Sequence, residues 1–157
     1  MPLELFPKQG NALWPKTTSG PGSYQLLIQL KPACHITVGR LGKFHFPAGT
    51  YIYTGSALSG LKGRISRHLA KHKIPYWHID YLLSAPQARL NRVYLYPGKR
   101  RRECTLNRRV QSLPGAGVIV PRFGCGDCRR GCASHLFYFS PNTPKTERLA
   151  GPAQLIC

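Results

Sequence analysis

The chain has 157 residues and carries 23 Lys plus Arg against 5 Asp plus Glu, a formal charge of +18 at pH 7. This length fits a single domain, and a 42% share of hydrophobic residues with only 18% charged residues excludes the composition typical of intrinsic disorder. Because so basic a surface repels itself, we expect a polyanionic partner, with nucleic acid ahead of an anionic membrane surface.

Strands dominate the first half of the predicted secondary structure. Residues 1–21 are rich in Pro, Gly, Ser and Thr and read as an extended N-terminal arm. The alternation of Tyr24, Leu26, Ile28 and Leu30, with Gln25 and Gln29 on the opposite face, then predicts a strand. Further strands are expected at residues 35–39, 43–46, 50–54, 90–96 and 135–139.

Helices are expected between and after these strands, at residues 58–72, 77–84 and 101–113. The first has the apolar stripe Leu58, Leu61, Ile65 and Leu69. Strands followed by mixed helices and strands favour an α+β fold over a doubly wound sheet. We therefore predict one domain over residues 22–140 and a proline-rich C-terminal tail over 141–157.

The chain offers few carboxylates for catalysis. Its acidic residues are Glu4, Asp80, Glu103, Asp127 and Glu147, and the first and last lie in the predicted arm and tail. A mechanism with two carboxylates, as in glycosidases, is therefore poorly supported.

Arg64 and His68 are four residues apart on the first predicted helix, so they share one face at the border of its apolar stripe. An arginine there can bind phosphate oxygens with its forked guanidinium, and a histidine can donate or transfer a proton. The alternative is an ordinary basic helix facing solvent.

Glu103 continues the apolar stripe Leu106, Val110 and Leu113 of a later helix. A carboxylate on a buried stripe is unfavourable unless it is paired or bound to a metal. One interpretation is a favourable charge at the helix N-terminus or a partner for the preceding arginines, and the other is a ligand for Mg²⁺ or Mn²⁺.

Cys125, Cys128, Cys132 and His135 lie within eleven residues and form a candidate tetrahedral Zn²⁺ site. Reduced buried cysteines or a labile disulfide are the alternatives. His78 and Asp80 are a lesser polar pair, for which a capping aspartate at a helix start is the simpler explanation.

The sequence has no apolar run long enough for a transmembrane helix and no apolar core of a secretory signal near its start. Clustered cysteines are typical of metal or redox sites in a reducing compartment. We therefore expect a cytoplasmic protein, associated with the nucleoid if the source is bacterial or archaeal.

Several motifs, taken in order, resemble the GIY-YIG nuclease superfamily. They are Gly22–Gln25 at the start of a strand, Tyr53–Ala57 at the end of another, Arg64 and His68 on the next helix, and Glu103 on a later one. More narrowly, Phe46–Ala57, Arg64–His68, Trp77–Leu83 and Ser134–Phe137 resemble an uncharacterised branch of that superfamily, sometimes attached to endonuclease III-type repair proteins.

The resemblance implies a small three-stranded antiparallel core flanked by helices, with an extra hairpin between the first two motifs. It implies a DNA endonuclease that uses one divalent metal, Mg²⁺ or Mn²⁺, in DNA repair or processing, with a DNA-repair protein as a further partner. Tyr24 and Tyr53 would line the cleft, Arg64 would stabilise the phosphate, His68 would assist proton transfer and Glu103 would hold the metal.

Contacts to nucleic acid are expected from residues near these motifs: Gly55, Ser56, Lys62, Arg67, Lys71, Lys73, Arg101 and Arg102. A non-catalytic nucleic-acid-binding module on the same fold and a zinc-stabilised interaction domain are the alternatives.

Overall fold

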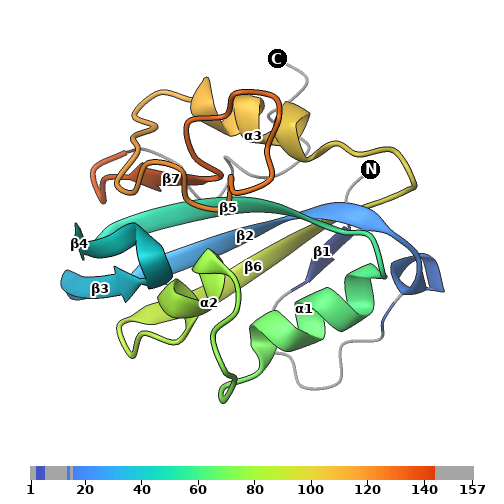
Figure 1. Cartoon of the computed structure of the whole chain (residues 1–157), viewed down its shortest axis with the longest axis horizontal. Coiled ribbons are helices and arrows are strands. Elements are labelled where there is room, and N and C mark those ends of the chain that lie inside the picture. The colour runs from blue at the N-terminus through green and yellow to red at the C-terminus, as the bar shows by residue number, and fades with distance from the viewer. Residues whose placement is uncertain (1–2, 6–13, 15, 144–157) are drawn as a thin grey trace.

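The computed structural model describes residues 3–5, 14 and 16–143, and at its centre is one antiparallel sheet (Figure 1). Its strands lie in the order β1-β6-β2-β5-β7. They span Leu3–Leu5 (β1), Gly22–Leu30 (β2), Gly49–Ala57 (β5), Ala88–Pro97 (β6) and Leu136–Phe139 (β7). With the helices described below, this sheet confirms the predicted α+β class.

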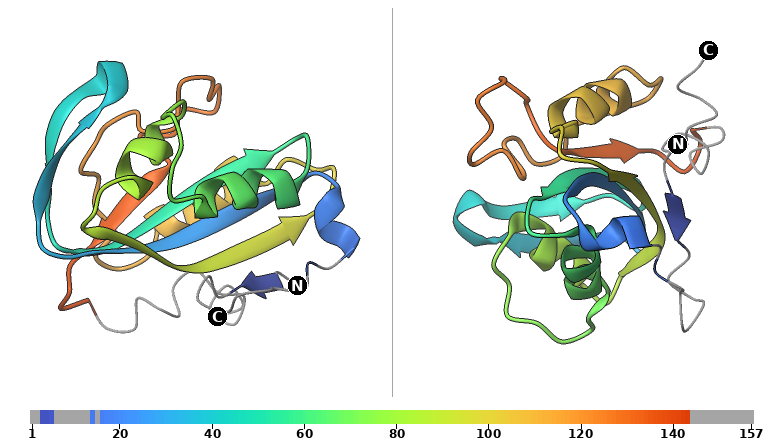
Figure 2. Two further views of the ribbon diagram at one scale, coloured as in Figure 1. Left: turned by 90° about the horizontal axis from the view of Figure 1, so that it is seen from below. Right: turned by 90° about the vertical axis from the view of Figure 1, so that its right-hand side faces the viewer.

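Both faces of the sheet are covered, so the protein has three layers (Figure 2). On one face Tyr24, Leu26 and Ile28 pack with helices α1 (Leu61–Leu69) and α2 (His78–Leu83). On the other, Leu27 packs with helix α3 (Glu103–Gln111). The second layer of helix explains why Gln25, predicted on the polar face of β2, is buried.

The sheet is wider than the three strands that the sequence resemblance implied. β6, β2 and β5 form its centre, and Leu3–Leu5 and Leu136–Phe139 add an edge strand on either side. These additions satisfy backbone groups that would otherwise be exposed along β6 and β5. The expected extra hairpin is present as β3 (Cys34–Val38) and β4 (Gly42–Phe46), a separate two-stranded sheet between β2 and β5 in the sequence.

Helix α1 is shorter than the predicted helix over residues 58–72, and this changes which of its residues are buried. It begins at Leu61, after Gly60 with a φ of 129°. Leu58 and Leu69 of the predicted stripe are consequently exposed, whereas His68 is buried beside Leu61 and Ile65. A polar side chain has therefore taken a core position, and it needs a hydrogen-bonding partner there.

The predicted arm over residues 1–21 is described only in part, and there it contains β1 and a short 3-10 turn at Lys16–Ser19. The part of the predicted tail beyond residue 143 lies outside the described residues. Within the described ranges, none of the helices has the length and apolarity needed to span a bilayer.

Candidate functional site

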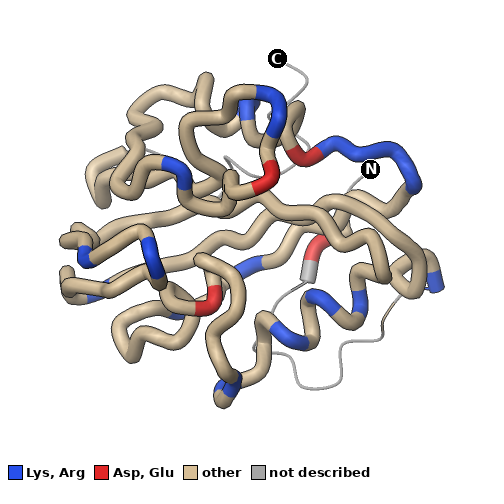
Figure 3. The backbone as a smooth tube through the Cα atoms, in the orientation of Figure 1, with Lys and Arg blue, Asp and Glu red and all other residues tan. Residues whose placement is uncertain are grey.

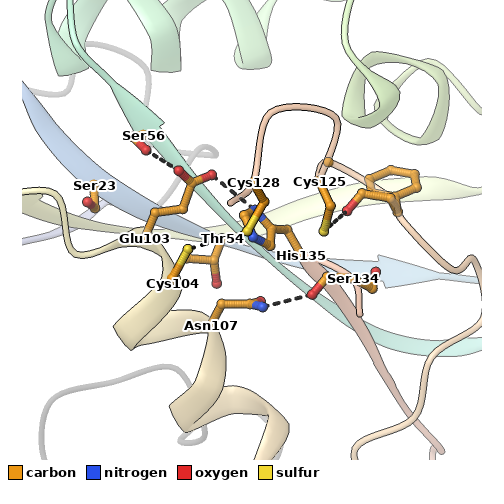
Figure 4. Close-up of polar contacts among 12 residues, drawn as sticks. Ser23, Thr54, Ser56, Glu103, Cys104, Asn107, Cys125, Cys128, Ser134 and His135 are labelled. Carbon is orange, nitrogen blue, oxygen red and sulfur yellow. Dashed lines mark hydrogen bonds and ion pairs between the residues drawn. The ribbon is translucent and has the colours of Figure 1, made fainter. Parts of the chain in front are cut away.

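Glu103, the first residue of α3, is held by side chains from two other segments (Figure 4). Ser56, near the end of β5, donates a short hydrogen bond to Glu103 Oε2, and His135 Nδ1 lies 3.0 Å from Oε1. Burial raises the pKa of the Glu103 carboxyl, but these hydrogen bonds outweigh burial and lower it below its ordinary value. The carboxylate is therefore ionised at neutral pH, in the first turn of α3, where the helix dipole favours negative charge.

Tyr24 and His68 form a buried pair below the surface of the site. The Tyr24 hydroxyl on β2 lies 2.7 Å from His68 Nε2 on α1. Burial lowers the pKa of His68 to about 3 and raises that of Tyr24, so both side chains are uncharged at neutral pH. The apolar stripe predicted His68 at the border of the buried side, but its side chain is only 3% exposed and faces Tyr24 instead of solvent.

Gly55 provides the space for this pair. A Cβ atom at residue 55 would lie 2.5 Å from the Tyr24 hydroxyl oxygen and 2.6 Å from Tyr24 Cζ. Gly55 is itself buried, and the close approach of the Tyr24 ring explains why a residue without a side chain is needed there.

Arg64 lies at the surface above the pair and is fixed on two sides. Its Nη1 donates a hydrogen bond of 3.1 Å to the Ser56 carbonyl oxygen, and its Cζ atom lies 4.1 Å from the centre of the Trp77 ring. The stacked face is shielded, but a guanidinium has five N–H donors, so several remain to bind an anion. Trp77 was not among the predicted site residues.

A cleft of about 500 Å³ brings together residues that lie far apart in the sequence. Its lining includes Tyr53, Arg64 and Glu103 of the predicted catalytic set, and also Ser56 and Arg101 of the expected nucleic-acid contacts. The other residues of the lining are Leu58, Ser59, Tyr76, Trp77, His78, Gly124, Gly126 and Asp127. Tyr24, which we expected to line the cleft, is fully buried behind Tyr53, with the two ring centres 6.2 Å apart.

Two of the predicted nucleic-acid contacts are engaged within the protein. Arg67 forms an ion pair of 2.8 Å with Asp80 and a hydrogen bond to the Ile74 carbonyl. Lys73 Nζ donates to the carbonyl groups of residues 67, 68 and 70, at the C-terminal end of α1. Both side chains stabilise the turn after α1.

Lys62, Lys71, Arg101 and Arg102 are exposed, and their contact with a nucleic acid stays a prediction. Figure 3 shows the basic residues on α1 and on the segment that leads into α3, both at the same end of the molecule. Arg64 on α1 and Arg101 on the segment before α3 also line the cleft.

His78 and Asp80 have structural partners. Asp80, the third residue of α2, is buried and accepts hydrogen bonds from the backbone N–H groups of Tyr76 and Trp77, so it caps the start of the helix from within its first turn. His78 Nδ1 accepts a hydrogen bond from the Gly124 N–H, 2.9 Å away. His78 thereby attaches the loop after α3 to α2.

The cysteine cluster differs in one member from the set predicted by spacing. Cys104, Cys128, Cys132 and His135 place their ligand atoms within 4.8 Å of one another, in an arrangement that could bind a metal ion such as zinc. Cys125 is not in this group; it is buried, and its Sγ faces the Phe123 carbonyl oxygen. Cys104 comes from α3, 24 residues before Cys128, and no local spacing pattern connects the two.

The Cys128 thiol ionises more readily than an ordinary cysteine. Burial raises its pKa, but hydrogen bonds from the backbone of Cys132 and Arg130 and from nearby side chains lower it to about 6. The thiolate is the form of cysteine that binds metals.

Residues 23–154 match the family described as Domain of unknown function DUF123. The match covers most of the chain, so the protein belongs to this family. Comparison with curated proteins found no match, and neither did comparison with solved structures.

Proposed function

We propose that this DUF123 protein hydrolyses phosphodiester bonds of DNA in the cleft, in DNA repair or processing. The observation that supports this most strongly is the convergence of Tyr53, Arg64 and Glu103 on one cleft, with the Tyr24–His68 pair directly behind it. These are the residues that the resemblance to GIY-YIG nucleases singled out, and they come from four separate elements of the fold.

Binding of a phosphate is supported by how Arg64 is held. Because Trp77 and the Ser56 carbonyl orient its guanidinium, little side-chain entropy is lost when a phosphate binds to the remaining donors. Arg101 lies at the same cleft and adds a second positive charge. The oriented Arg64, together with Arg101, would stabilise the negative charge that develops on the phosphate oxygens during hydrolysis.

The cleft also has the carboxylates that a hard cation prefers. Glu103 is ionised, and Asp127 lines the same cleft. A carboxylate oxygen that accepts one hydrogen bond still has a lone pair, so these two residues could hold Mg²⁺ or Mn²⁺ together with water molecules and the substrate phosphate. When bound, such an ion would polarise the phosphate and lower the pKa of a coordinated water.

The tyrosines act as hydrogen-bond donors and not as bases in this proposal. Burial raises the pKa values of Tyr24 and Tyr53, so both phenols keep their protons at neutral pH. Tyr53 orients the attacking water or a phosphate oxygen, and the Tyr24–His68 pair supports its ring from behind. Hydrolysis forms a bond between the water oxygen and phosphorus, breaks one P–O bond to a sugar, and leaves that sugar with a hydroxyl group.

The test is cleavage of a panel of DNAs by the purified protein: duplex, flap, bubble and abasic duplex, each with and without Mg²⁺ or Mn²⁺. We expect metal-dependent cleavage that is lost in Glu103→Gln and in Arg64→Ala, with DNA binding largely kept. The matched controls are Glu4→Gln on β1 and Arg89→Ala on β6, which make the same two changes in charge at residues outside the cleft lining. Absence of cleavage on every substrate, or full activity of Glu103→Gln, would contradict the proposal.

One observation favours a second candidate, a nucleic-acid-binding module without catalysis. Both oxygens of Glu103 already have partners in Ser56 and His135, so the carboxylate has a structural role that does not require a metal in the cleft. This candidate predicts salt-sensitive DNA binding. In a plot of the logarithm of affinity against the logarithm of salt concentration, the slope should be about −0.9 for each neutralised phosphate. It further predicts that Glu103→Gln leaves DNA binding unchanged and that no variant or wild-type protein cleaves DNA.

A further inference from the structure

We propose that Cys104, Cys128, Cys132 and His135 bind one Zn²⁺ in a tetrahedral Cys₃His site that connects α3 to the loop before β7. The four ligand atoms lie within 4.8 Å of one another, and they come from a helix, a loop and the residue that precedes a strand. Figure 4 shows Cys104 on α3 facing Cys128 and His135. Glu103 lies next to both this site and the cleft, but the zinc proposal does not depend on the proposed hydrolysis.

The distance between two of the sulfur atoms has the value expected for zinc ligands. Cys104 Sγ and Cys128 Sγ are 3.7 Å apart. Two thiolates each about 2.3 Å from a tetrahedral zinc ion lie about 3.8 Å apart. A disulfide would need a separation of about 2.05 Å. The observed spacing therefore fits two ligands of one metal ion and is too long for a covalent bond.

The imidazole of His135 is oriented as a metal ligand. It is 2% exposed, and its Nε2 atom has no hydrogen-bond partner, whereas Nδ1 lies 3.0 Å from Glu103 Oε1. A proton on Nδ1, donated to Glu103, leaves the lone pair of Nε2 for the metal. Histidine ligands of zinc commonly donate their other N–H group to a carboxylate in this way. An unpartnered buried nitrogen is unfavourable, and coordination satisfies it.

The surroundings suit the charge and the structural role of such a site. Three thiolates and one Zn²⁺ leave a net charge of −1, and Arg101, Arg129 and Arg130 lie around the same pocket. The chain between α3 and β7 has no regular helix or strand over residues 114–135. A metal that joins this segment to α3 would supply the cross-link that its secondary structure does not provide.

The first experiment is metal analysis of the full chain, purified without chelators, for the wild type and two cysteine variants. We expect about one zinc per chain in the wild type, less than 0.2 per chain (roughly a fivefold loss) in Cys104→Ser, and about one in Cys125→Ser. Cys125 is the matched control because it is more buried than Cys104 and lies in the same region, but is not among the four ligands. Sequence spacing alone predicts the reverse outcome for these two variants.

The second experiment remains informative if Cys104→Ser fails to fold. Zinc in the wild-type protein is exchanged for Co²⁺, and the visible and near-ultraviolet absorption is recorded. We expect the strong ligand-field bands of tetrahedral cobalt together with thiolate-to-cobalt charge transfer. Wild-type protein with less than about 0.2 zinc per chain and no cobalt bands would overturn the proposal, as would a Cys104–Cys128 disulfide in the purified protein. Neither readout involves DNA, so the zinc site and the proposed nuclease can fail separately.

Discussion

The buried state of His68 makes the stability of the protein depend on pH in a way that can be calculated. Its pKa falls from an ordinary value of 6.5 to about 3 in the folded protein because burial disfavours the charged imidazole. Between these two values the unfolded chain binds a proton that the folded protein does not, so stability falls as the pH is lowered from 6.5 towards 3. At pH 5 the difference is about 1.5 pH units, which corresponds to a loss of about 2 kcal/mol relative to pH 7.5.

Replacement of His68 by Gln removes this dependence. Gln keeps a hydrogen-bonding group near the Tyr24 hydroxyl but does not titrate. When the pH is lowered from 7.5 to 5, the free energy of unfolding should therefore fall by about 2 kcal/mol less in His68→Gln than in the wild type. The measurement is urea unfolding at a series of pH values. His72→Gln, which removes an exposed imidazole just beyond α1, is the control and should follow the wild type.

A second measurement tests the same argument without a variant. An NMR titration of the wild-type histidines should show no protonation of His68 down to pH 5, because its pKa of about 3 lies far below that range. Parallel stability curves for the wild type and His68→Gln, or a His68 signal that titrates near pH 6, would refute the reasoning. His68 would then be charged under acidic conditions and could serve directly as a proton donor.

Three further predictions concern the walls of the cleft and the elements that support them. Gly55→Ala places a Cβ atom 2.5 Å from the Tyr24 hydroxyl oxygen and should lower the free energy of unfolding by about 1–3 kcal/mol in denaturant. The control is Gly63→Ala on α1, whose added Cβ atom would have no neighbour within 4 Å and should leave stability unchanged or raise it by up to about 1 kcal/mol. Trp77→Leu removes the aromatic surface under Arg64 and should slow metal-dependent DNA cleavage by roughly 2- to 30-fold, about 0.5–2 kcal/mol, while DNA binding measured by fluorescence anisotropy is largely kept. An unchanged cleavage rate would show that the stacking on Trp77 does not position Arg64 for catalysis. Asp80→Asn should lower the unfolding free energy by about 1–3 kcal/mol at pH 7. Hydrogen bonds from the backbone and the ion pair with Arg67 lower the pKa of Asp80 despite burial. The stabilisation by the Asp80 carboxylate is therefore fully present above its ordinary pKa of 3.8 and is lost as the pH falls through the lower pKa of the folded protein. The unfolding free energies of the wild type and Asp80→Asn should consequently converge at acid pH.

Periodic patterns in the sequence predicted the elements of the fold because these patterns report on local geometry. The alternation from Tyr24 to Leu30 corresponds to β2, and the stripe Leu106 and Val110 corresponds to the buried side of α3. The same stripe drew attention to Glu103, whose carboxylate does have partners from other segments. Side-chain direction repeats every two residues in a strand and about every 3.6 in a helix, so a single sequence contains this information.

Only the tertiary structure decided which side chains meet. Cys104 replaces Cys125 in the candidate zinc site, His68 takes a core position instead of Leu69, and Lys73 is bound to the end of α1. Each outcome depends on how elements distant in the sequence pack against one another, and spacing along one segment does not contain that information. The basic composition and the few acidic residues by themselves predict a polyanionic partner. The packing of α1, α2 and α3 around the sheet determined that Arg64 and Glu103 line one cleft and that His135 joins Glu103 to the cysteines.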